Sequence, residues 1–332
     1  MFLSFSGLLP STCPVSALRR ALLAAACWLY GPWAAATTEI LPVQRIASDV
    51  YVITAPLADA SPSNGGRVVN TGFVIGRTGV VVIDSGANHR HGEAILAAVA
   101  RVTKKPVALL INTHPHPHNV LGNSAFADRG IPIMATSATV TAMTERCPAC
   151  LASLSQSVGD EPMRGTRIQL PDTPVAGSQT LEVAGRQLRL LHLGHGHTEG
   201  DLAVFDEATA VLFAGDLVYG GQVPHLSEAN TTGWIAALNQ VAALPVRILV
   251  SGRGPVGGAG DLEPTLRYLS ELRQRVAAAY QEGRTPDEAI KLAELPEFSD
   301  WHGYAARHGR NVQHVYFEIE RDDMGGQSEA RR

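Results

Sequence analysis

The chain has 332 residues, of which 45% are hydrophobic and 17% charged, with a net charge of -4 and a pI near 6.3. This is an ordinary globular composition, and the length suits one large α/β domain or two small ones. No basic face or run is apparent, so the sequence predicts no nucleic-acid partner.

The first 36 residues have the features of an export signal. Arg19 and Arg20 supply positive charge, residues 21–30 are apolar, and Ala34–Ala36 provide small residues before a cleavage point. The apolar stretch is shorter than the ~20 residues that a bilayer-spanning helix needs. We therefore expect a signal peptide over 1–36, a periplasmic mature protein and no stable membrane insertion after cleavage, with an uncleaved anchor as the alternative.

Apolar runs that end in turn residues predict the strands of a mixed sheet, and helical spacing of apolar residues predicts helices between them. In chain order the expected strands are 50–54, 68–75, 79–83, 107–111, 168–170, 181–183, 188–192, 202–205, 211–214 and 248–251. The expected helices are 91–102, 136–157, 232–243 and most of the chain after Leu262, with breaks at Gly283 and Pro296.

These elements predict one main domain over 37–258 and a helical C-terminal part of the same domain over 259–321. Residues 322–332 are polar, and a polar chain end favours a disordered tail.

Histidines and other polar residues gather where the apolar runs stop. The segment 112–119 reads N-T-H-P-H-P-H-N, and its prolines resist helix and keep it open. His114 and His116, separated by one residue, can direct two imidazole nitrogens at one cation. Three further polar groups follow other apolar runs: 194–201, Gly215-Asp216 and 252–254. Loops held by a rigid sheet often carry binding groups in this way.

Together these motifs resemble the metallo-β-lactamase superfamily. The signature of that family has four blocks in chain order: T-H-x-H-x-D-H followed by G, then H-T-x-G-D, then G-D, and last G-H-G. The order and spacing match across residues 64–255, including 70–72 and 84–86. The resemblance implies an α/β fold, the αββα four-layer metallo-β-lactamase sandwich, with a metal site at one edge of the two sheets. Here it would carry a helical C-terminal extension.

A closer similarity is to the zinc metallohydrolases of quinoprotein relay systems. It depends on segments 71–73, 121–123 and 163–166 and on the C-P-A-C pair of Cys147 and Cys150. This similarity implies a periplasmic oxidoreductase as partner. For the cysteine pair we expect a local disulfide, and a redox role is the alternative.

The family pattern implies that His114, His116 and His197 hold a first zinc ion in an open site with room for water. Asp216 matches the aspartate that would bridge two metals. Iron is the alternative metal, since a histidine-rich open site accepts it. Asp84 is expected to hold the metal loops through hydrogen bonds.

Three positions depart from the pattern: His118 replaces an aspartate, and Asn119 and Arg253 each replace a histidine. A neutral amide is a poor zinc ligand, and an arginine cannot ligate at all. We therefore expect a mononuclear site in which the Arg253 guanidinium partly replaces the missing cation. It would pair with Asp216 or orient an anionic substrate group.

The predicted function is hydrolysis of a small-molecule ester, thioester, lactone or lactam by metal-bound hydroxide, since zinc lowers the pKa of its water to around 7. His118 and Asp216 are the candidate catalytic bases. Arg253 and His225 are the candidate substrate-binding residues, with a surface position as the alternative for His225. The alternative functions are a β-lactamase and a non-catalytic binding protein of a periplasmic oxidation system.

Overall fold

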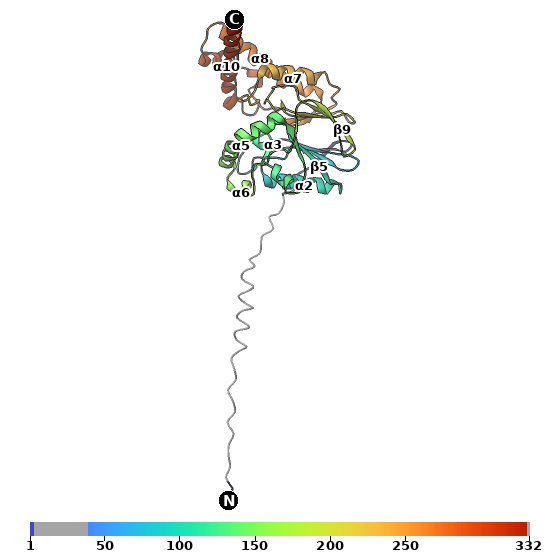
Figure 1. Ribbon diagram of the computed structural model, residues 1–332. Helices are drawn as coiled ribbons and strands as arrows, with labels where there is room; N and C mark the ends of the chain where they lie inside the picture. Colours follow the sequence, from blue (N-terminus) through green and yellow to red (C-terminus); the bar gives the residue numbers. More distant parts are fainter. Residues whose placement is uncertain (3–38, 331–332) are drawn as a thin grey trace. The chain divides into compact units, whose positions relative to one another are not determined.

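Two β-sheets form the centre of the fold (Figure 1). The computed structural model describes residues 1–2 and 39–330, so nearly all of the expected signal peptide lies outside the described residues. The seven-stranded sheet has the order β1-β2-β3-β4-β5-β6-β7, and the six-stranded sheet has the order β13-β12-β11-β10-β9-β8. The strands of the first sheet are β1 Gln44–Ala47, β2 Val50–Ile53, β3 Thr71–Ile75, β4 Val80–Ile83, β5 Val107–Ile111, β6 Ile133–Thr136 and β7 Thr173–Val175. Those of the second are β8 Gln179–Val183, β9 Arg186–Leu191, β10 Ala203–Asp206, β11 Val211–Tyr219, β12 Ile248–Arg253 and β13 Val256–Gly257.

Helices cover both outer faces of this pair of sheets. They are α2 His89–Val102, α3 Pro117–Val120, α4 Asn123–Ala127, α5 Ser137–Val158, α6 Asp160–Met163, α7 Thr231–Ala242, α8 Glu263–Gln281, α9 Pro286–Leu292 and α10 Tyr304–Ala330. Short 3₁₀ turns lie at Ala259–Leu262 and Pro296–Phe298.

The continuous apolar runs become strands that are buried on both faces. Val81 and Phe213 belong to the core between the two sheets. Ile95 of α2 packs with the core on the outer face of the first sheet, and Trp234 of α7 packs with α8 and α10 on the second. Burying each sheet face and each apolar helix stripe requires these layers, and the predicted αββα sandwich with its helical C-terminal region is confirmed.

Several sequence predictions need correction. The strand expected at 168–170 is wrong. This segment is irregular, and Ile168 packs against Met143 of helix α5. The strand expected at 211–214 continues to Tyr219, because β11 pairs in parallel with β12 beyond the polar Gly215-Asp216 step. The first strand, Gln44–Ala47, was not predicted, since its edge position leaves it exposed and weakly patterned.

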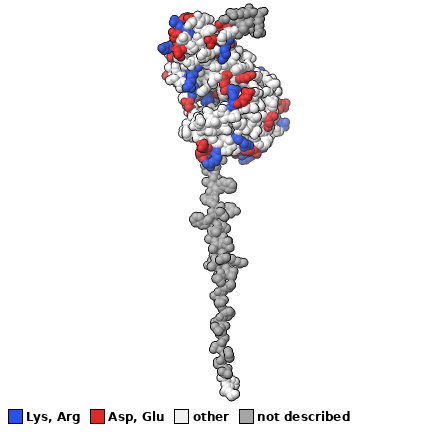
Figure 2. Space-filling view, turned by 60° about the vertical axis from the view of Figure 1, so that its left-hand side comes forward, with Lys and Arg blue, Asp and Glu red and all other residues white. Residues whose placement is uncertain are grey.

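The described helices after residue 259 pack on the second sheet, in the same compact unit as the two sheets. Helix α10 continues to Ala330, past the tail boundary expected at Asp322. Within the described residues, no helix is both long and apolar enough to cross a bilayer. Basic and acidic side chains are interspersed on the face drawn in Figure 2.

Candidate metal centre

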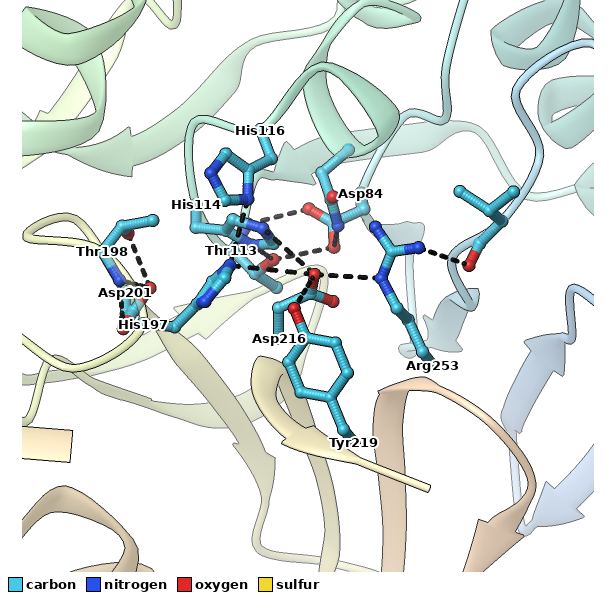
Figure 3. A network of polar contacts seen from close by, with 12 residues as sticks. Asp84, Thr113, His114, His116, His197, Thr198, Asp201, Asp216, Tyr219 and Arg253 are labelled. Atoms are coloured by element: carbon cyan, nitrogen blue, oxygen red, sulfur yellow. Dashed lines mark hydrogen bonds and ion pairs between the residues drawn. The ribbon is translucent and has the colours of Figure 1, made fainter. Parts of the chain in front are cut away.

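Four side chains from three parts of the chain meet at one end of the sheets (Figure 3). His114 and His116 follow β5, His197 lies in the loop after β9, and Asp216 lies within β11. One donor atom from each lies within 4.8 Å of the others. The fold therefore brings His116 and His197 together, as the motifs predicted, although 81 positions separate them in the sequence.

The donor atoms in this group fit a divalent metal ion. His197 Nε2 lies 3.0 Å from His116 Nδ1, and His114 Nε2 and His197 Nε2 each lie 3.8 Å from Asp216 Oδ2. His114 Nε2 is buried without a hydrogen-bond partner in the described structure, and so is Asp216 Oδ1. Such orphaned atoms are costly unless something binds them, and three imidazole nitrogens with one carboxylate are suitable zinc ligands.

Asp84 holds the histidine segment from behind. Its carboxylate accepts hydrogen bonds from Thr113 N–H, Thr113 Oγ1 and Asn119 Nδ2, each at 2.8 Å. Thr113 Oγ1 in turn lies 2.9 Å from His114 Nδ1, which leaves His114 Nε2 to face the metal position. Burial raises the pKa of Asp84 to about 7. The structural role predicted for Asp84 is confirmed, and Asn119 serves the same support rather than the metal position.

A second buried carboxylate holds the loop of His197. Asp201 accepts the Thr198 N–H at 3.0 Å and the Thr198 hydroxyl at 2.6 Å. The carbonyl of Gly200 accepts hydrogen bonds from Thr136 Oγ1 at 2.9 Å and Thr139 Oγ1 at 3.1 Å. Both ligand-bearing loops are thus fixed before any metal binds, which favours a preorganised site.

Arg253 lies on the opposite side of Asp216. It is 5% exposed, its Nε lies 3.3 Å from Asp216 Oδ2, and its Nη1 donates to the Val68 carbonyl at 3.4 Å. The predicted pairing with Asp216 is therefore present. A Cβ at Gly252 would lie 2.1 Å from Asp216 Oδ1, so only glycine allows this approach of β12. Burial raises the pKa of Asp216, but the charges of Arg253 and His114 outweigh burial and hold it well below its usual range.

Tyr219 is a site residue that the sequence analysis missed. Its hydroxyl donates to Asp216 Oδ2 at 2.9 Å, and burial raises its pKa well above the ordinary value. Tyr219 follows Asp216 by three residues at the end of an apolar strand. The apolar run that continues past Asp216 was the sequence signal that could have identified Tyr219.

His118 and His225 are not among the four grouped donors. His118 Nδ1 lies 3.1 Å from the Gly66 carbonyl. Burial, and then the charge of Arg253, lowers the pKa of each histidine to about 3. Both side chains are half-buried, and with a pKa this low both are neutral at neutral pH. Their catalytic and substrate-binding roles stay predictions.

Glu228 was also missed, because nothing in its sequence neighbourhood marks it. Its Oε1 lies 3.7 Å from His116 Nε2, the ring nitrogen that faces away from the other histidines, and its Oε2 forms an ion pair with Arg146 Nη1 at 2.5 Å. Contact with His116 lowers the pKa of Glu228.

Comparison with known proteins places this site in a family. The family model described as "Metallo-beta-lactamase superfamily" matches residues 64–253. A "Metallo-beta-lactamase type 2" of Bacillus sp. (strain 170) is 24% identical over 241 residues, covering 70% of this chain and 83% of that protein. A "Linear primary-alkylsulfatase" of Pseudomonas sp. (strain ATCC 19151) is 21% identical over 286 residues, and the match covers 74% of this chain and 54% of that protein. The chain thus spans about half the length of the alkylsulfatase.

The fold is also found among solved structures. A metallo-beta-lactamase from Pontibacter korlensis superposes with a TM-score of 0.58 at 24% identity, covering 69% of this chain and 99% of that one. Helices α8, α9 and α10 follow the region that the family model matches.

Proposed function

The chain belongs to the metallo-beta-lactamase superfamily, and from that premise we propose that it is a zinc-dependent hydrolase that holds one metal ion per chain. One observation carries the single-metal proposal: the Arg253 guanidinium is buried 3.3 Å from Asp216. A fixed cation at this distance repels a second metal ion and already neutralises the carboxylate that would bridge two metals.

The other two altered positions support the same proposal. Asn119 donates Nδ2 to Asp84 and could offer a metal only its neutral amide oxygen, a poor zinc ligand. His118 Nδ1 is engaged by the Gly66 carbonyl. One neutral histidine and a carboxylate paired to arginine leave too few ligands for a second tetrahedral zinc.

When bound, a zinc ion would supply Lewis acidity toward water and toward a substrate carbonyl. Asp216 would orient the attacking water, because its carboxylate lies 3.8 Å from both His114 Nε2 and His197 Nε2. Its pKa is held well below the usual range, so it acts by orienting the water rather than as a strong base. Tyr219 and Arg253 keep that carboxylate ionised and in place. His118 is a hydrogen-bond acceptor and a weak base here, since its pKa lies near 3.

The proposed substrates contain an ester, thioester, lactone or lactam bond. Arg253 and His225 would line the part of the cleft that receives an anionic group, since a guanidinium fork suits carboxylate or sulfate oxygens. A β-lactamase is the second candidate, favoured by relatives of that name that match over 83–87% of their length. A non-catalytic binding protein is the third.

We also propose export to the periplasm and association with an oxidoreductase there, on the basis of the N-terminal sequence and the quinoprotein-type motifs. N-terminal sequencing of protein from a periplasmic extract tests the first part. A mature chain that starts at Thr37 would support it, and intact Met1 in the cytoplasmic fraction would refute it.

Elemental analysis of protein purified without added metal tests the main proposal. We expect about one zinc ion per chain, and the triple variant His118→Asp, Asn119→His, Arg253→His should bind about one more. Two zinc ions in the unaltered protein, or no gain in the variant, would refute the single-metal site. Protein without metal would favour the binding-only alternative.

A panel of ester, thioester, lactone and β-lactam substrates then tests hydrolysis by the metal-loaded protein. Turnover that disappears in His116→Ala supports the hydrolase. No turnover across the panel would contradict it. Preference for β-lactams would favour the second candidate.

A further inference from the structure

Helix α5 carries a pair of thiols that the proposed hydrolysis does not use. Cys147 and Cys150 are both free thiols, so the local disulfide expected from the sequence is absent from the structure. They stand three positions apart in the helix and therefore share one face of it. The Cβ atoms of such positions lie ~5–6 Å apart in a regular helix. A disulfide needs Cβ atoms about 3.5–4.5 Å apart, so closing one requires a small local movement of the backbone.

The two thiols differ in access and in acidity. Cys147 is 1% exposed and packs against Val120 and Met143, whereas Cys150 is half-buried. The hydrogen bond between them lowers the pKa of the Cys150 thiol. The same contact, together with burial, raises the pKa of Cys147. An accessible thiolate beside a sheltered thiol is the arrangement of a nucleophilic and a resolving cysteine.

Pro148 lies between the two cysteines, inside the helix. A proline there has no N–H to donate to the carbonyl four residues earlier, and this weakens the helix locally. The backbone at the pair is therefore freer to adjust when the two sulfur atoms approach.

Helix α5 also contacts both loops that carry metal ligands. Thr136, its N-cap, and Thr139 bind the Gly200 carbonyl in the loop of His197. In the middle of the helix, Cys147 packs on Val120 of α3, directly after the histidine segment.

The residue before Cys147 gives a third connection. Arg146 pairs with Glu228 Oε2 at 2.5 Å, and Glu228 Oε1 lies 3.7 Å from His116 Nε2. A shift of α5 at the cysteine pair therefore reaches a metal ligand through one ion pair and one contact between a carboxylate and an imidazole.

We propose that Cys147 and Cys150 form a reversible dithiol–disulfide site that exchanges with disulfide partners and changes the affinity of the metal centre. The Cys150 thiolate attacks a partner disulfide, forms a mixed disulfide and releases one partner thiolate. Cys147, after losing its proton to solvent, attacks Cys150 Sγ, closes the intrachain disulfide and releases the second partner thiolate. The pair loses two electrons, and the partner disulfide gains them as two thiols. This site goes beyond the proposed hydrolase and does not require catalytic activity.

Oxidised and reduced glutathione are the probe. The metal-loaded full chain is equilibrated in glutathione mixtures, its free thiols are alkylated, and it is cut with trypsin. Cleavage after Arg146 and Arg164 yields one peptide, 147–164, that contains both cysteines and no other basic residue inside it. In reducing mixtures we expect this peptide to be alkylated on both cysteines. In oxidising mixtures we expect it to carry no alkyl group and to be two hydrogens lighter than the dithiol peptide, with the change occurring in a single two-electron step.

Single variants provide matched controls. In Cys147→Ser, Cys150 should remain as a stable mixed disulfide with glutathione. In Cys150→Ser, Cys147 should react with the alkylating reagent at least about tenfold more slowly than Cys150 does. Independent glutathione adducts on both cysteines, or a pair that stays reduced in every mixture, would overturn the redox site.

Competition with a zinc chelator tests the coupling to the metal. We expect oxidation to shift the metal affinity by about two- to tenfold, and Glu228→Gln to reduce that shift. Identical competition curves for the two redox forms would overturn the coupling. Absence of hydrolysis would affect neither measurement, so this proposal and the proposed function fail separately.

Discussion

The two sides of Asp216 are built in opposite ways. On one side, three histidines converge, and Asp84 and Asp201 fix their loops through buried hydrogen bonds. On the other side, a buried arginine takes the place where further ligands would stand. The first side is arranged to receive a cation, and the second already contains one. Under the single-metal proposal, the fixed charge of Arg253 replaces the second ion beside Asp216 and keeps the electrostatic balance of the site.

The largest expected effect is on the histidine side. His116→Ala removes one ligand atom from the group of four. Losing a residue that only hydrogen-bonds to a ligand costs about 10–100-fold in metal affinity, so losing a ligand should cost at least about 100-fold. Elemental analysis after dialysis measures the loss. His195→Ala, in an exposed residue of the neighbouring loop, is the control, and equal metal loss in both variants would contradict the assignment.

The next effect concerns the arginine side. Arg253→Gln leaves the Asp216 carboxylate buried beside neutral groups. Removing one partner of a buried ion pair costs about 3–5 kcal/mol, so we expect a loss of that order in the free energy of unfolding of the metal-free protein. Urea denaturation measures it, and adding Asp216→Asn should recover part of the loss. A change below about 1 kcal/mol would mean that the pair does not compensate for a missing cation.

Four histidines with lowered pKa values predict how stability depends on pH. Burial lowers the pKa of His91, His114, His118 and His225 from 6.5 to about 3. Between these values the unfolded chain binds more protons than the folded one, so the free energy of unfolding of the metal-free protein falls as the pH falls through this window. The raised pKa values of Asp84 and Asp201 act in the opposite direction but are fewer.

His118→Gln tests this pH dependence at one of these histidines. One histidine contributes at most about 1.4 kcal/mol per pH unit to the slope. Urea denaturation between about pH 4 and pH 7 should therefore give a flatter slope for the variant than for the unaltered protein. An unchanged slope would mean that His118 already titrates near its ordinary value when folded.

The difference between the two sides also explains what the sequence could predict. The histidine side was predictable, because its ligands lie in short motifs directly after apolar strands. The pairing of Arg253 with Asp216 followed from replacing a ligand by a cation beside a carboxylate. Glu228 was not predictable, since it reaches His116 only through the path of an irregular loop between β11 and α7. The false strand at 168–170 arose because an apolar run under a helix has the same pattern as a short buried strand.

Tyr219→Phe has the smallest expected effect, and it tests Asp216, the residue that lies between the two sides. The variant removes the hydroxyl that donates to Asp216 Oδ2 and leaves the ring in place. A hydrogen bond to a charged group is worth about 1.5–3 kcal/mol, and because Arg253 still pairs with the same oxygen we expect a loss near the lower value. The matched control is Tyr268→Phe, which removes an equally buried hydroxyl that bonds to Asn311 in the C-terminal helices. Both variants should lower the free energy of unfolding, but only Tyr219→Phe should also weaken metal binding in chelator competition. If neither variant changes metal affinity, Asp216 acts mainly as the partner of Arg253, and the three histidines alone define the metal site.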